Sequence, residues 1–263
     1  MYKLLALDID ETTLRHDGTL SQANKDAIIK VKEKGAYVAI LTGRSPKAAR
    51  TVWEKLPVND ICVCFGGAVM VDMRNNLILH TSAIESDIVT DALEYAGCLG
   101  LVSQIYVGDA VMTEYENPYT KAYTDYLKLD CIIEPKIREK VHTDIPKLLM
   151  FVEENKQSEY IQKLREHFGE RADITASTKN FIEINSHGMN KGKGLADLCS
   201  MLGISTSEVV AMGDSLIDVP MLEAAGVGIA VANASEKVKS IADVISPDCD
   251  NDAVAWAVEK YFN

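Results

Sequence analysis

The stretch LLALDIDETTL, residues 4–14, decides how the rest of the chain is arranged. Apolar residues lead directly into Asp8, Asp10 and Glu11, so the stretch predicts a buried strand that ends in three carboxylates. In an open α/β sheet, ligands bind at the carboxyl ends of the strands. Like charges this close repel each other, and either a divalent cation or a protonated carboxyl would relieve the repulsion. Acidic pairs also occur in ordinary solvated turns after strands, so the remaining strand ends decide between a turn and a site.

The composition is acidic, with 27 basic and 39 acidic residues among 263 and a net charge of -12. Phosphate backbones and anionic membranes repel such a chain, and no basic run offsets the repulsion. We therefore expect no nucleic acid and no membrane as partner, and a monomer or a small homo-oligomer. A small anionic substrate remains compatible if local cations or a metal reverse the sign at the site.

The cysteines indicate a reducing environment, because they form no CxxC pair and lie in apolar segments. We expect them to be reduced core residues. Cys62 and Cys64 share one face of a predicted strand, which favours core packing over a zinc site. The chain starts directly with a core strand, and no apolar run approaches 18 residues. These features predict a cytoplasmic protein.

The first third of the chain alternates strands and helices. A helix is expected from Ser21 to Lys34 with Gly35 as its stop, followed by a buried strand over 36–41, which makes a βαβ unit. A second helix over 46–56, a third strand over 61–65 and a hairpin over 66–82 follow.

The pattern changes near residue 84 and returns near residue 187. Between them, helices over 85–95 and 158–168 flank several short strands, which indicates a separate α+β unit. Neither flank has enough strands to complete a sheet alone, so one α/β domain, 1–83 with 187–263, is interrupted by an inserted domain, 84–186. The strands expected in this second part are 102–106, 110–115, 148–152, 181–185, 208–214 and 228–232.

Three further strand ends carry polar side chains that suit the chemistry of phosphate. They are Thr42 in LTGR, Lys191 in NKGKG, and Asp214 with Asp218 in GDSLID. One carboxylate can attack phosphorus and a second can protonate the leaving oxygen, while a hydroxyl and a lysine hold the phosphoryl group. A further carboxylate would complete the oxygen ligands of a magnesium ion. The combination indicates phosphoryl transfer.

DIDET, LTGR, NKGKG and GDSLID resemble, in this order and spacing, the four motifs of the haloacid dehalogenase superfamily. The layout is similar to the Cof-type, sugar-phosphatase-like branch, which carries a large inserted α/β cap. The resemblance implies a Rossmann-like core with a mostly parallel, doubly wound sheet and an α+β cap that closes over the site. It further implies a Mg²⁺-dependent phosphatase that hydrolyses a small phosphorylated metabolite through an aspartyl-phosphate.

The same resemblance assigns the catalytic and metal-binding roles. Asp8 would be the nucleophile, and Asp10 would protonate the leaving alcohol and then activate water. Asp8, the backbone carbonyl of Asp10 and Asp214 would ligate Mg²⁺, with Asp218 as a ligand through water or as the residue that orients Lys191.

Phosphate binding would fall to Thr42, the amide of Gly43 and Lys191. Arg44 would reach the substrate or form a surface ion pair. His187 and Gly188 are expected at the hinge on the return from the cap, and the inserted segment also carries tyrosines that could contact substrate or pack. These are Tyr115, Tyr119, Tyr123 and Tyr126.

Two positions depart from the family pattern. Gly66 and Ile217 stand where the family usually has asparagine, so two hydrogen-bond donors near the phosphate are missing. These departures leave open a weakly active protein that binds a phosphometabolite. A second alternative keeps the chemistry but passes the phosphate to another alcohol, as in a phosphotransferase or phosphomutase of the same superfamily. A signalling receiver domain is disfavoured, because its phosphate acceptor lies on a later strand than its acidic pair.

Overall fold

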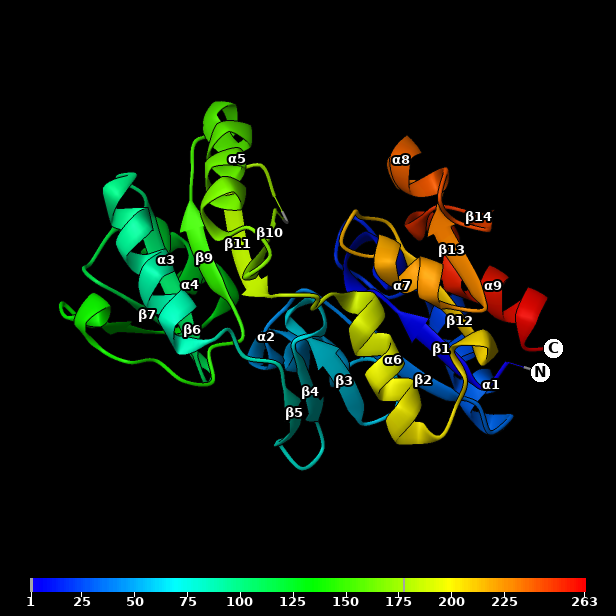
Figure 1. Ribbon diagram of the computed structural model, residues 1–263. Helices are drawn as coiled ribbons and strands as arrows, with labels where there is room; N and C mark the ends of the chain where they lie inside the picture. Colours follow the sequence, from blue (N-terminus) through cyan, green and yellow to red (C-terminus); the bar gives the residue numbers. More distant parts are fainter. Residues whose placement is uncertain (1, 177) are drawn as a thin grey trace. The chain divides into compact units, whose positions relative to one another are not determined.

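The computed structural model describes residues 2–176 and 178–263, which divide into two compact units (Figure 1). The first, here called the core, consists of Met1–Leu79 and Asn190–Asn263, and the second, called the cap, consists of His80–Met189. Each unit contains its own sheet.

The core is built on a sheet with the strand order β14-β13-β12-β1-β2-β3-β4-β5. The strands from β14 to β3 are parallel, and β4 runs antiparallel to β3. This architecture confirms the predicted α/β class with a mostly parallel sheet. The strand bounds are β1 Leu4–Leu7, β2 Tyr37–Leu41, β3 Ile61–Cys64, β4 Val69–Asp72, β5 Leu77–Thr81, β12 Val209–Gly213, β13 Val227–Val231 and β14 Val244–Ser246.

Strand β1 lies inside this sheet, between strands from opposite parts of the chain. Leu7 at its end is level with Ile40 of β2 and with Met212 of β12. Because all three strands run in the same direction, their carboxyl ends meet at one edge. All four side chains of β1 are completely buried, as expected for a strand covered on both faces. Residues that follow β1, β2 and β12 therefore start from neighbouring positions.

The helices of the core begin at recognisable capping residues. The side chain of Ser21 accepts a hydrogen bond from the amide of Asn24, and Ser45 caps the next helix ahead of a proline. Asn190 caps the helix that starts with Lys191 and thus fixes where that lysine begins. The bounds are α1 Gln22–Glu33, α2 Pro46–Trp53, α6 Lys191–Leu202, α7 Val219–Ala224, α8 Glu236–Lys239 and α9 Ala253–Tyr261.

The cap is an α+β unit with the strand order β10-β11-β9-β6-β7-β8. Its apolar core joins one face of the sheet to two helices: Val89 and Leu93 of α3 and Phe168 of α5 pack with Leu148 and Ile182. The bounds are α3 Ser86–Cys98, β6 Val102–Val107, β7 Ala110–Thr113, α4 Pro118–Leu127, β8 Asp130–Ile133, β9 Leu148–Phe151, α5 Gln157–Phe168, β10 Ala172–Thr175 and β11 Phe181–Ser186.

The tyrosines of the inserted segment are partly used for packing inside the cap. The hydroxyl of Tyr123 forms a hydrogen bond with that of Tyr106, and Tyr119 stacks on Phe151 with ring centroids 5.7 Å apart. Tyr126 is 83% exposed. At the end of the cap segment, His187 and Gly188 are both bound to the carboxylate of Asp173.

The expectation that all cysteines are core residues is wrong for Cys98 and Cys131, which are exposed. Cys98 ends α3 and Cys131 lies on β8, whose side chains are all exposed, so the local apolar pattern does not mean burial there. The other four cysteines are buried.

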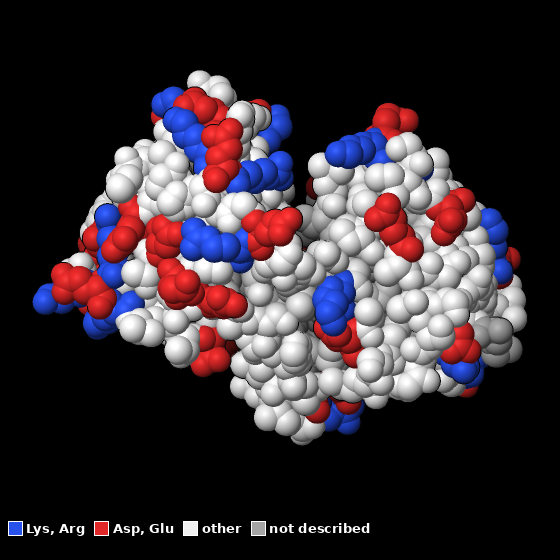
Figure 2. All heavy atoms as spheres, viewed as in Figure 1, with Lys and Arg blue, Asp and Glu red and all other residues white. Residues whose placement is uncertain are grey.

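The surface charge and the length of the helices bear on the expected absence of nucleic acid and membrane partners. On the face shown in Figure 2, acidic and basic side chains are interspersed. Lys163 and Glu159 on α5 form one such pair of opposite charges, 2.6 Å apart. No helix in the described part of the chain is both long and apolar enough to cross a membrane.

Candidate active site

Asp8 lies at the buried end of β1, where the backbone leaves the sheet. Its amide donates a hydrogen bond to the carbonyl of Met212, 3.1 Å away, and the side chain is almost completely buried. The chain then forms a single π-helical turn, Ile9–Thr13, which is kinked at Asp10 and at Glu11, whose φ is 54°. The hydroxyl of Thr13 donates to the carbonyl of Asp8 at 2.6 Å and closes this turn. The turn keeps Asp8 inside while Asp10 points outward.

Lys191 connects two of the buried carboxylates. Its ammonium donates to Oδ1 of Asp8 at 2.5 Å and to Oδ1 of Asp218, and its side chain has no solvent exposure. Burial alone would lower the pKa of this lysine, but the charges of Asp218 and Asp8 outweigh burial and raise it. Lys191 is therefore a permanently charged group that holds one oxygen of Asp8 in place.

Asp218 is completely buried and is oriented from its other oxygen. Oδ2 accepts hydrogen bonds from the hydroxyl and the amide of Ser215, at 2.7 and 2.9 Å. The backbone of Gly213 approaches this side chain so closely that a Cβ there would lie 2.4 Å from the Cβ of Asp218. A glycine is required at the end of β12 for this reason.

Asp214 follows β12 directly and faces the turn after β1. The hydroxyl of Thr12 donates to its Oδ1 at 2.9 Å. Desolvation by burial, reinforced by the nearby charge of Asp218, raises the pKa of Asp214 to about 6. Burial likewise raises the pKa of Asp8 far above its usual range, although Lys191 opposes the effect.

A divalent cation fits this cluster on both geometry and charge. Asp8, Asp214 and Asp218 each offer one carboxylate oxygen, and these oxygens lie within 4.8 Å of one another. Lys191 balances only one of the three buried carboxylate charges. The pKa values of Asp8 and Asp214 are raised because the remaining negative charge is buried, and a bound cation would compensate it. Oxygen donors at this spacing are the ligands that magnesium and calcium prefer.

The loop after β2 supplies further polar groups to the same edge of the sheet. Thr42 is buried, its hydroxyl accepts a hydrogen bond from the amide of Arg44, and its carbonyl accepts one from Gly66. Gly43 is covered by Ile217, since a Cβ on Gly43 would lie 3.3 Å from Cδ1 of that side chain. Gly66 has a φ of +66° and open space around the position of a Cβ.

Arg44 and Asp10 form a bidentate ion pair. The Nε of Arg44 lies 2.9 Å from Oδ2 of Asp10, and an Nη lies 2.5 Å from Oδ1. The carboxylate of Asp10 is more than half exposed. Of the two expectations for Arg44, the ion pair is the arrangement present in this structure.

The structure brings Asp8, Lys191, Asp214 and Asp218 into one cluster, with Thr42 and Gly43 on the next strand end. Two orienting residues were not predicted from the sequence: Thr12, which binds Asp214, and Ser215, which binds Asp218. Both lie inside the quoted motifs, Thr12 in DIDET and Ser215 in GDSLID. Their closeness in sequence to the acidic residues is the feature that could have identified them.

Comparisons with known proteins agree with this geometry. A family model for haloacid dehalogenase-like hydrolases matches residues 5–258. The chain is 30% identical over 266 residues to the 5-amino-6-(5-phospho-D-ribitylamino)uracil phosphatase YcsE of Bacillus subtilis, covering 98% of this chain and 95% of that protein. It is 25% identical to the pyridoxal phosphate phosphatase YbhA of Escherichia coli, covering 98% of each.

Solved structures extend the agreement to the fold. The crystal structure of TM0651 from Thermotoga maritima superposes with a TM-score of 0.86 at 26% identity, covering 99% of this chain and 97% of that chain. A haloacid dehalogenase-like hydrolase from B. subtilis gives a TM-score of 0.85 at 26% identity, covering 98% and 99%. With four motifs at one sheet edge and a family match over nearly its whole length, this chain belongs to the haloacid dehalogenase-like hydrolases and is a phosphatase of that superfamily.

Proposed function

We propose that this phosphatase hydrolyses a small phosphomonoester in a Mg²⁺-dependent reaction, with Asp8 as the nucleophile. The observation that carries the proposal is the fixation of Asp8. Lys191 holds its Oδ1, whereas within the described part of the chain Oδ2 accepts no hydrogen bond. One oxygen is thus oriented and the other is available to attack phosphorus.

The reaction would proceed in two transfers. Oδ2 of Asp8 forms a bond to phosphorus as the bond to the leaving alcohol breaks, and Asp10 gives that alcohol its proton. Water then attacks phosphorus, passes a proton to Asp10 and restores the Asp8 carboxylate as phosphate leaves. The hydroxyl of Thr42, the amide of Gly43 and Lys191 would bind the phosphoryl oxygens.

Arg44 has to release Asp10 during this sequence. A guanidinium favours the ionised form of a paired carboxylate, whereas the first transfer needs Asp10 with its proton. We therefore propose that the ion pair opens when the substrate binds, with Arg44 turning to an anionic group of the substrate.

The metal would be held by Asp8, Asp214 and the backbone carbonyl of Asp10, with Asp218 close by. When bound, Mg²⁺ would neutralise the carboxylates and stabilise the charge on the phosphoryl oxygens.

Two relatives support a proposal for the substrate class. YcsE is named for a phosphoribitylaminouracil and YbhA for pyridoxal phosphate. Both compounds carry a phosphomonoester on a side chain of a planar heterocycle. We propose a phosphomonoester of this size, either a heterocyclic one or a sugar phosphate.

A panel of such phosphomonoesters with Mg²⁺ tests the proposal, with phosphate release as the readout. Release in water without an added alcohol supports hydrolysis, whereas transfer that requires a second alcohol would identify a phosphotransferase. Binding without turnover on the whole panel would favour the phosphometabolite-binding alternative. Rapid acid quenching with ³²P-labelled substrate should trap label on the protein, and Asp8→Asn should abolish it. Asp17→Asn, at an exposed acid bound to Thr19, is the matched control.

A further inference from the structure

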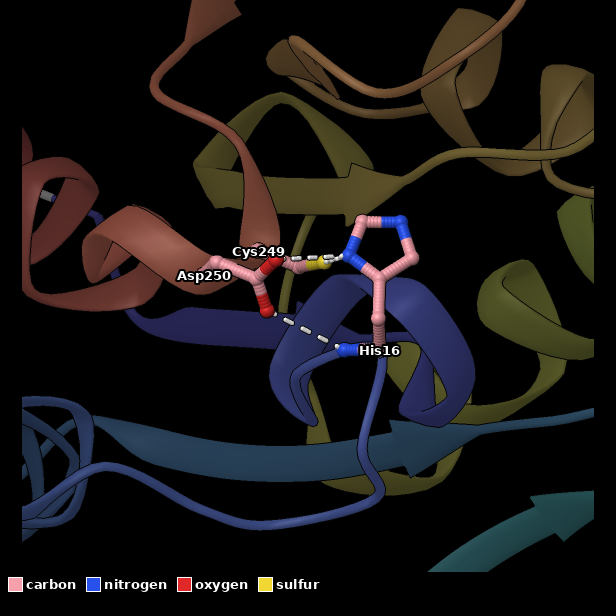
Figure 3. A group of neighbouring side chains, drawn as sticks. All are labelled: His16, Cys249 and Asp250. Atoms are coloured by element: carbon pink, nitrogen blue, oxygen red, sulfur yellow. Dashed lines mark hydrogen bonds and ion pairs between the residues drawn. The ribbon is translucent and has the colours of Figure 1, made fainter.

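A second cluster of potential metal ligands lies in the core, away from the three site carboxylates. It joins His16, after the turn that follows β1, to Cys249 and Asp250 in a 3-10 turn, Cys249–Asn251, ahead of α9 (Figure 3). One ligand atom from each of the three residues lies within 4.8 Å of the others. We propose that these residues form a second metal site, for a thiophilic borderline divalent ion such as Zn²⁺.

The donor set distinguishes this cluster from the all-oxygen site. Imidazole nitrogen, thiolate sulfur and carboxylate oxygen together are typical zinc ligands, whereas Mg²⁺ prefers oxygen alone. In Figure 3 the imidazole Nδ1 faces both the sulfur of Cys249 and the carboxylate of Asp250. The two clusters would therefore bind different ions: Mg²⁺ at the all-oxygen site and Zn²⁺ at His16, Cys249 and Asp250.

The distances are close to those of a tetrahedral zinc centre. Nδ1 of His16 lies 3.3 Å from Sγ of Cys249 and 2.8 Å from Oδ2 of Asp250. Bond lengths of about 2.3 Å to sulfur and about 2.0 to 2.1 Å to nitrogen and oxygen place tetrahedral ligands roughly 3.4 to 3.6 Å apart. To reach that geometry, the nitrogen and sulfur would need to separate by about 0.3 Å and the nitrogen and oxygen by about 0.6 Å, with water as the fourth ligand.

The backbone around the cluster is fixed from both sides. The amide of His16 donates to Oδ1 of Asp250 at 3.2 Å, and the amide of Cys249 donates to Oδ1 of Asn233 at 3.0 Å. Asn233 in turn donates to the carbonyl of Glu11 at 2.8 Å. The ligand atoms are thus held near each other before any ion binds, which lowers the entropic cost of forming the site.

The surrounding charge also favours a cation. Glu11 and Asp248 lie close enough to act on Cys249 electrostatically, together with Asp250. The cluster joins positions 233 residues apart in the sequence. An ion there would link the region before α9 to the segment after the turn Ile9–Thr13, which contains Asp10 and Glu11.

Co²⁺ serves as the probe, because thiolate ligation produces a near-ultraviolet charge-transfer band that oxygen ligands do not produce. The full chain is titrated with Co²⁺ in excess Mg²⁺, which occupies the all-oxygen site. We expect a band that saturates at one equivalent, is lost in Cys249→Ser and is retained when the exposed cysteines are replaced in Cys98→Ser/Cys131→Ser. No thiolate band in the unaltered protein, or a band that survives Cys249→Ser, would overturn the proposal.

A second variant keeps the test decisive if Cys249→Ser folds poorly, because Asp250 is exposed and can be replaced without opening the core. Asp250→Asn should weaken Zn²⁺ binding at least about tenfold, measured by competition with a chromophoric chelator. Asp17→Asn, whose carboxylate is bound to Thr19 instead, should leave the affinity within about twofold. Equal Zn²⁺ affinity in Asp250→Asn and the unaltered protein would show that the bound ion is held elsewhere.

Discussion

Replacing Asp214 with asparagine should stabilise the metal-free protein at neutral pH. The pKa of Asp214 is raised to about 6 from an ordinary value of 3.8, mainly by burial. Between these two values the native state holds more protons than the unfolded state, so the free energy of unfolding falls as pH rises through this window. Above pH 6 the full cost of the buried charge is present, and below pH 3.8 it is absent.

The size of the effect follows from the shift of about 2 pKa units. At about 1.4 kcal/mol per unit, the charge costs roughly 3 kcal/mol, an upper limit because solvent still screens part of the interaction. Asparagine carries no charge and can still accept the hydrogen bond from Thr12. With about 2 to 4 °C per kcal/mol for a chain of this size, Asp214→Asn should raise Tm by up to about 6 to 12 °C.

Urea unfolding in excess chelator, at pH 7.5 and again at pH 4, measures this effect. Both tryptophans, Trp53 and Trp256, belong to the core, so their fluorescence follows unfolding of the unit that contains Asp214. Glu223→Gln, at an exposed acid of α7, is the matched control and should change little. A loss of stability in Asp214→Asn at pH 7.5, or an equal gain at both pH values, would refute the reasoning.

Three further predictions concern catalysis. Asp8→Asn should reduce phosphate release below a few per cent while inorganic phosphate still binds, because only the attacking oxygen is lost; equilibrium dialysis and turnover assays check both parts. Ca²⁺ should suppress turnover supported by Mg²⁺, because its larger coordination number allows it to engage both oxygens of Asp8; undiminished rates in Ca²⁺ would contradict this. Gly66→Asn with Ile217→Asn should raise kcat/KM on a nitrophenyl phosphate about ten- to a hundredfold, the value of one hydrogen bond to a charged acceptor, and a lower Tm without kinetic gain would argue against it.

Gly66 and Ile217 differ in how well their surroundings would accept an asparagine. Gly66 lies in the left-handed region with open space around it, which asparagine tolerates better than most residues. Ile217 packs on Gly43, so its replacement also removes apolar contact. Comparing the two single variants separates the missing donor from the lost packing.

Most strands of the core sheet could be predicted from the sequence, because they are short apolar runs and several of them end at Gly, Asp or Thr. The run LLAL before Asp8 and the run VVAM before Gly213 are both completely buried, so hydrophobicity alone indicates them. Strands β8, β10 and β14 were not predicted, because they have only three or four residues each and few consecutive apolar ones. Helix α9 was not predicted either.

Asp8, Thr42 and Asp214 follow core strands as predicted, whereas Lys191 begins helix α6, after a strand that belongs to the cap sheet. The motifs placed Asp8, Lys191 and Asp214 at neighbouring positions, whereas the pairing of Arg44 with Asp10 depends on the kinked turn at Glu11. Likewise, nothing in the spacing of His16 and Cys249 indicates that they meet, because the sheet order brings them together only after folding. Local sequence patterns do not predict contacts between segments that are far apart in the chain.

The central position of β1 has a consequence for synthesis on the ribosome. Leu4 lies next to Val209, so β1 finds one of its two neighbours only after some 200 further residues have been added. At about 5 to 20 residues per second, the edge of β1 waits roughly 10 to 40 s while the whole cap is made. Throughout that interval an apolar strand edge is open to wrong pairing. Nascent chains stopped before β12 should therefore be bound by chaperones, and chains extended beyond β12 should be released.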